Sequence, residues 1–86
     1  MTFGADNEVT PDVSGWMIIA ATADSSLTAA PIVRICSTVS HSVVMAEGVG
    51  PLVPNGAYHV AMPVKVGQTY YPIAYRGALA SARVYY

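Results

Sequence analysis

The chain has 86 residues, of which 53% are hydrophobic and nine are charged, and its formal net charge is −1. A chain of this length forms one small domain, and it is too apolar to be disordered. Its four cations, Arg34, Lys65, Arg76 and Arg83, are scattered, so we expect no nucleic acid as a partner.

Targeting signals are missing from the sequence. No apolar run approaches the roughly 18 residues of a membrane helix, so no membrane insertion is expected. Residues 1–7 have neither the basic start nor the apolar stretch of a secretion signal, which predicts synthesis in a cytoplasm. With Cys36 alone there is no internal disulfide, and stability must come from the core and any oligomer.

Residues 1–14 hold three of the five acids and show no alternation, which indicates an extended lead-in or linker before a domain at 15–86. The rest of the chain alternates with a period of two, and short strands recur about every ten residues. This pattern predicts an all-β fold, a small antiparallel β-sandwich or small barrel. The expected strands are Trp16–Thr22, Ile32–Ser37, Ser42–Glu47, Ala57–Met62, Thr69–Tyr75 and Ala80–Tyr86.

Both faces of the strand Trp16–Thr22 are apolar. Either it is a central strand covered on both sides, or its second face meets a neighbouring subunit. We expect this strand and Ala80–Tyr86 to be the most buried, so that Trp16→Ala costs about 3 to 5 kcal/mol. Arg34 predicts partial exposure of one face of its strand, and Pro72 is restricted to an edge strand or a bulge.

Turn residues separate these strands. Asn55-Gly56 favours a tight turn, whereas residues 48–51 favour a looser loop. The longest loop is expected at 47–58, and its apolar pair Leu52-Val53 is either folded under or presented to a partner.

The sequence offers little for catalysis. No two acids are paired on a rigid element, and no glycine-rich phosphate loop precedes a helix, so we expect no enzyme and no cofactor. Cys36 and His41 could form a nucleophile and base, but a buried strand cysteine beside a surface histidine is the favoured interpretation. His41 and His59 are too few for a metal site on one chain, although a threefold axis could gather three copies of one of them.

Two stretches together resemble the C-terminal tip domain of bacteriophage tail fibres. The first is Pro11-Asp12-Val13-Ser14 leading into Gly15-Trp16; the second runs from Met62-Pro63-Val64-Lys65-Val66-Gly67-Gln68 to Ala82-Arg83-Val84-Tyr85-Tyr86. In that family a PD.S segment, a GW strand, a PVxxGQ turn and a terminal arginine-aromatic strand recur. The similarity covers about Pro11 to Tyr86. The Thr-Ala-Pro segment that usually precedes the Gly-Trp pair is absent here.

The resemblance implies a β-sandwich that assembles as a homotrimer on the virion and binds a bacterial surface glycan or outer-membrane protein during adsorption, without chemistry. Nine charges on so apolar a chain independently favour association with copies of itself. Aromatic and polar residues on loops suit sugar binding. The candidate receptor-binding residues are His41, Leu52, Asn55, Tyr58, His59, Tyr75 and Arg76. Each tyrosine among them could instead pack in the core or between subunits.

A virion structural protein is the alternative function. A capsid-decorating or fibre-capping trimer would use its surface to bind other virion subunits and no receptor. A receptor-binding tip should attach to host cells when isolated, whereas a decorating protein should attach to emptied particles.

Overall fold

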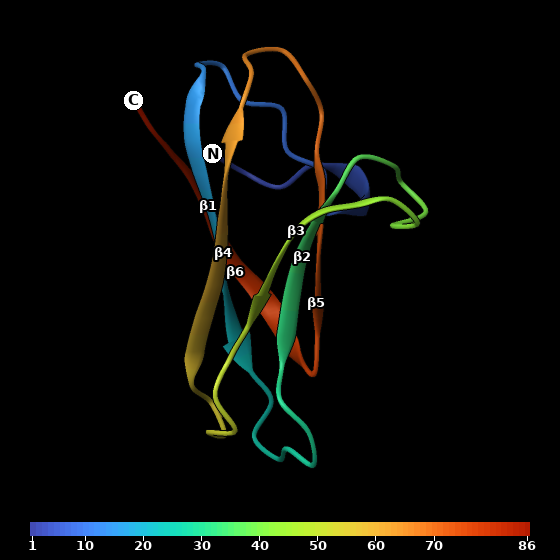
Figure 1. Cartoon of the computed structure of the whole chain (residues 1–86), viewed down its shortest axis with the longest axis vertical. Helices are drawn as coiled ribbons and strands as arrows, with labels where there is room; N and C mark the ends of the chain where they lie inside the picture. Colours follow the sequence, from blue (N-terminus) through green and yellow to red (C-terminus); the bar gives the residue numbers. More distant parts are fainter.

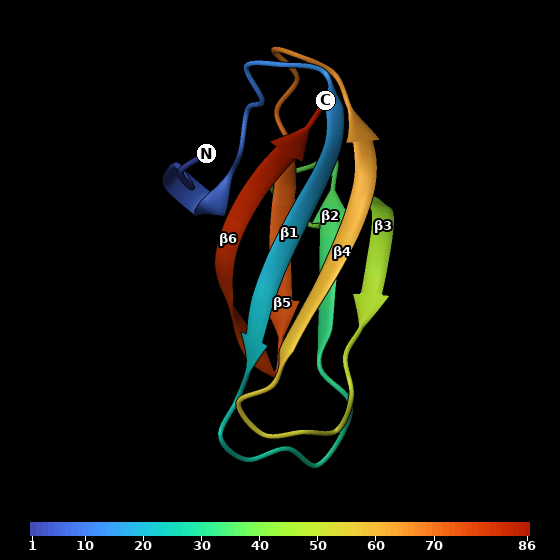
Figure 2. The ribbon, with the colours of Figure 1, turned by 90° about the vertical axis from the view of Figure 1, so that its left-hand side faces the viewer.

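The computed structural model describes residues 1–86 and contains two antiparallel sheets of three strands each (Figure 1). In chain order the elements are the 3-10 turn η1 (Ala5–Asn7), β1 (Gly15–Ala23), β2 (Ile32–Cys36), β3 (Val44–Val49), β4 (Ala57–Val64), β5 (Tyr71–Tyr75) and β6 (Gly77–Tyr85). The strand order is β4-β1-β6 in one sheet and β3-β2-β5 in the other. Figure 2 looks onto the first sheet, with the second behind it. The predicted all-β sandwich is confirmed, and no helix is long and apolar enough to cross a membrane.

All six expected strands are present, with shifted ends. The largest shift is at the start of β6, which begins three residues early. β3 starts two residues late and continues through Gly48 and Val49, where the sequence predicted a loop. Gly48 pairs with Val33 in the sheet and passes close to β4. A side chain at this position would collide with the backbone carbonyl of His59, so the glycine permits the close approach of the two sheets.

The core lies between the sheets and is built from alternate residues of each strand, as the period of two predicted. The central strands β1 and β2 contribute most of it. Its fully buried side chains include Met17, Ile19, Val33 and Ile35, joined by Tyr58, Val60 and Val64 of β4.

Two burial predictions are wrong. Trp16 is 58% exposed, because β1 is covered on one side only. In β6 only Ala82 is buried, while Tyr85 is 54% exposed, because it pairs with Trp16 on the same uncovered face of the sheet. The other strongly buried strand is β2, in which three of five residues are buried. The predictions for Arg34, which is half-buried, and for Pro72, on the edge strand β5, are confirmed.

Residues 1–14, expected as a lead-in, pack onto the domain. Val9 and Tyr70 exchange two backbone hydrogen bonds, of 2.8 and 2.9 Å, and the side chain of Val9 is part of the core. The core thus begins before residue 15.

The turn at 65–68 contacts this same N-terminal segment. The backbone N–H of Gly67 donates to the carbonyl of Pro11 (2.9 Å), and that of Val66 donates to Oγ of Ser14 (2.9 Å). Gly67 has a φ of 83°, a left-handed conformation that glycine adopts without strain. Two of the motifs that carry the resemblance to fibre tips therefore meet in space.

Candidate functional site

Three segments far apart in the sequence meet at one end of the sandwich, the lower end in Figure 1: residues 24–31, 50–56 and 75–77. We call this surface the loop end. Asp24 connects the segments, because its N–H donates to the carbonyl of Arg76 (2.9 Å) and its carbonyl accepts from the N–H of Asn55 (3.0 Å). The guanidinium of Arg76 then reaches across to the carbonyl of Ala30 (3.0 Å). These hydrogen bonds hold the three segments together, so that they form one continuous surface.

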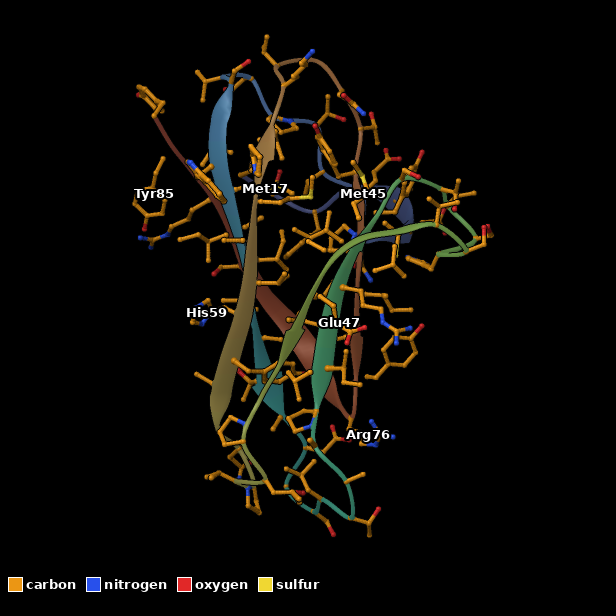
Figure 3. All side chains as sticks on the ribbon, in the orientation of Figure 1. Met17, Met45, Glu47, His59, Arg76 and Tyr85 are labelled. Carbon is orange, nitrogen blue, oxygen red and sulfur yellow. The ribbon has the colours of Figure 1, made fainter.

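Two residues of the loop end have left-handed backbones, Asn55 with a φ of 61° and Arg76 with a φ of 58°. Asparagine adopts this conformation readily, whereas for arginine it costs about 1 kcal/mol. Strained residues that the surrounding structure holds in place are typical of binding sites. In Figure 3 the side chain of Arg76 points outward on the side of the β3-β2-β5 sheet.

The apolar pair in the 50–56 loop is presented to solvent. Leu52 is 59% exposed and Val53 is 51% exposed, so the alternative that they fold under as a small core is wrong. This loop is shorter than the predicted 47–58 segment, because β3 and β4 take residues from both of its ends.

Tyr58, a predicted binding residue, lies inside the molecule. Its side chain is 4% exposed, and its hydroxyl donates to the carbonyl oxygen of Tyr75 at 3.4 Å. Burial, with a smaller effect from the charge of Asp24, raises the pKa of Tyr58. Tyr58 therefore supports the Tyr75 turn from beneath and is out of reach of a receptor.

A cation, an anion and an aromatic ring meet on the outer face of the β3-β2-β5 sheet. Arg34 Nε donates to Glu47 Oε2 at 2.7 Å, and the same guanidinium lies 5.2 Å from the centroid of the Tyr75 ring. The hydrogen bond to Glu47 is the main reason that the pKa of Arg34 is raised.

Beside this group is a hollow of about 430 Å³, lined by Ile32, Arg34, Tyr75 and Arg76. Sequence reasoning missed Arg34 and Glu47 as part of a site, because their contact depends on the pairing of β2 with β3. A larger hollow of about 590 Å³, between the N-terminal segment and the end of β6, contains none of the predicted binding residues.

The two histidines do not join the loop end. His41 lies in the 37–43 connection at the opposite end of β2, and His59 points outward from β4 on the face away from the second sheet (Figure 3). Cys36 is fully buried and faces the carbonyl oxygen of His41 at 3.9 Å, not its ring. Burial raises the pKa of the Cys36 thiol, which disfavours the thiolate that a nucleophile needs.

The outer face of the β4-β1-β6 sheet forms a second surface of interest. Across it, Trp16 lies between Pro63 and Tyr85, and the next row places Ile18 between Ala61 and Arg83. In a third row, the small Ala20 lies between two polar side chains, His59 and Ser81. With Arg83 as the one charge in these rows, this outer face is an open apolar surface of the kind that binds protein partners.

No group of three or more His, Cys, Asp or Glu side chains is arranged to hold a metal ion. Comparisons with protein-family models, with curated proteins and with solved structures gave no match for this chain.

Proposed function

We propose that the chain is a non-enzymatic tip domain of a bacteriophage tail fibre, carried on the virion, that binds a receptor on the bacterial surface during adsorption. One observation carries the proposal: the four motifs of the resemblance form two contacting pairs. The Pro11–Ser14 segment bonds to the 65–68 turn, and the strand that begins Gly15-Trp16 pairs with the terminal strand, Trp16 opposite Tyr85. Motifs that pack together support a shared domain more strongly than motifs that only recur in a sequence.

The loop end is the proposed receptor surface. It presents Leu52, Val53 and Arg76 on loops held by hydrogen bonds to one another, with Tyr75 at the adjoining end of β5. Loops on a rigid scaffold are where binding residues concentrate. An apolar pair, a ring and a guanidinium at one end of the molecule suit a glycan or an outer-membrane protein.

The proposed homotrimer uses the outer face of the β4-β1-β6 sheet. Trp16 and Tyr85 are the aromatic anchors, and the small Ala20 and Ala61 let a second copy approach closely. Such an assembly leaves the loop ends of all three copies free. Three weak contacts acting together then give useful avidity.

Attachment of the labelled, purified chain to host cells tests this function. We expect saturable attachment that is lost in the double variant Leu52→Ala with Asn55→Gly, in which glycine keeps the left-handed backbone at 55. Val66→Ala is the matched control, since Val66 is an exposed apolar residue in the 65–68 turn at the other end of the molecule. Both variants should keep the melting temperature and the assembled mass of the original chain.

The open apolar face also favours a second candidate, a virion structural protein that binds other virion subunits, as a capsid-decorating or fibre-capping trimer. Trp16 and Tyr85 would then contact a different protein and not a copy of this chain. Attachment to emptied particles, with none to cells, would support this candidate against the receptor role.

A further inference from the structure

The hollow between Arg34 and Arg76 has the features of a binding site for a small anion-bearing ligand. We propose that it binds an acidic sugar, a pyranose with a carboxylate or phosphate group, exposed on the host surface. This inference rests on the proposed receptor role and names the ligand class of the same end of the molecule.

Arg34 is held in position before any ligand arrives. Glu47 engages its Nε atom at 2.7 Å and the Tyr75 ring lies against the guanidinium, so the side chain is fixed from two sides. The terminal amine protons that Tyr75 does not engage remain for a ligand. A guanidinium whose orientation is already set loses less conformational entropy when it binds, which favours recognition.

Arg76 supplies a second fixed cation at the same hollow. Its backbone is left-handed, and its side chain crosses the loop end, where Nη1 donates to the carbonyl of Ala30 at 3.0 Å. The remaining donors of this guanidinium are free for an anion. Arginine forks match the two oxygens of a carboxylate or phosphate group better than a point charge does.

The charges around the hollow favour an anion. Two guanidiniums line it, and no carboxylate does. Glu47 faces Arg34 from the neighbouring strand and offsets one positive charge, while Asp24 is bonded to the Arg76 turn through its backbone. A neutral sugar would leave the charge of Arg76 without an anionic partner, whereas one acidic group on the sugar would neutralise it.

The size and apolar lining favour a sugar over a bare anion. A volume of about 430 Å³ is in the range of small-molecule sites and exceeds what a lone carboxylate or phosphate fills. Tyr75 and Ile32 add apolar surface against which the C–H groups of a pyranose can pack.

The test is an NMR or calorimetric titration of the whole chain with five probes. D-Glucuronate and glucose 6-phosphate are the acidic sugars, methyl glucoside is the neutral one, and acetate and inorganic phosphate are the anions without a ring. We expect at least one acidic sugar to bind about tenfold or more tightly than methyl glucoside and than its matching bare anion. The two acidic sugars distinguish a carboxylated from a phosphorylated receptor.

Variants locate the site. Arg34→Gln and Arg76→Asn should each weaken binding of the preferred sugar about tenfold, and asparagine tolerates the left-handed backbone at 76. Arg83→Gln removes a cation from the opposite face and should bind like the original chain. If the circular dichroism spectrum shows that Arg34→Gln is unfolded, the titration of Arg76→Asn alone tests whether the hollow is the binding site.

Equal binding of methyl glucoside, or unchanged binding by Arg76→Asn, overturns the acidic-sugar assignment. If no sugar binds while the chain still attaches to host cells, the ligand class is wrong and the receptor role stands. A chain that binds neither sugars nor cells overturns both.

Discussion

The hydroxyl of Tyr58, buried on β4 of one sheet, donates a hydrogen bond to the backbone carbonyl of Tyr75 at the end of β5 in the other sheet, 3.4 Å away. The bond joins the two sheets directly beneath the loop end. The exposed ring of Tyr75 and the strained turn at Arg76 thus depend on a core residue that no ligand touches.

Tyr58→Phe removes this bond and keeps the packing of the ring. We expect the free energy of unfolding to fall by about 0.5 to 1.5 kcal/mol, the usual net value of such a bond. Urea denaturation measures it. Tyr71→Phe is the control, because the hydroxyl of Tyr71 makes no hydrogen bond within the chain. Equal losses in the two variants would show that the Tyr58 bond contributes nothing.

The raised pKa of Tyr58 predicts weaker folding in alkaline solution. In the unfolded chain this phenol loses its proton near its ordinary pKa of 10.0, whereas the folded chain holds the proton to higher pH. The stability linked to Tyr58 is therefore complete below pH 10 and is lost as the pH rises above it. Urea midpoints from pH 9 to 11 should fall less steeply in Tyr58→Phe than in the original chain, and parallel curves would contradict this.

Trp16→Ala should now have a small effect on the fold, not the 3 to 5 kcal/mol expected for a core residue. Trp16 is mostly exposed, so we expect a loss below about 1 kcal/mol in the monomer together with weaker association. Ile19→Ala, on the buried face of the same strand, should cost about 2 to 5 kcal/mol. Urea denaturation and sedimentation together separate the two effects. As the chain's single tryptophan, Trp16 should also shift its fluorescence to shorter wavelength on assembly.

The sequence was sufficient to predict the strands but not which of their faces are covered. Short runs with a period of two or of continuous apolar residues, separated by turn residues, identified all six strands. In β1, however, Ile18 and Trp16 are as apolar as Met17 and Ile19, and the pattern cannot distinguish a face covered by the same chain from a face left open. For β6, burial was expected, whereas alternate side chains such as that of Tyr85 lie on the uncovered face of the sheet, beside Trp16.

The candidate site was predictable only where it depends on local sequence. Tyr75 and Arg76 were found because a glycine follows them in a turn. The contact of Arg34 with Glu47 and Tyr75 depends on the register of β2 against β3 and β5, which no local signal gives. His59 was named among the candidate receptor-binding residues although it lies within the expected strand Ala57–Met62, and the structure places it on β4.

Cys36 should resist thiol reagents in the folded chain. Its side chain is fully buried and its pKa is raised by burial, so both access and the thiolate fraction are low. We expect slow modification at pH 8 in buffer and fast modification in denaturing urea. A thiol reagent that releases a chromophore lets absorbance measure both rates. Fast reaction of the folded chain would instead reopen the assignment of Cys36 and His41 as a nucleophile and base.

Gly77→Ala should destabilise the junction beneath the loop end. A methyl group at Gly77 would collide with the hydroxyl of Tyr58 and the backbone carbonyl of Thr22, and such overpacking costs about 1 to 3 kcal/mol. Combining it with Tyr58→Phe removes one of the two obstacles, so the double variant should lose less free energy of unfolding than the sum of the single variants. Gly67→Ala is the comparison, since its added methyl meets no atom within 4 Å and its cost comes from the left-handed backbone alone, about 1 kcal/mol. Strict additivity in the urea-denaturation cycle would mean that Gly77 and Tyr58 act independently and would contradict this.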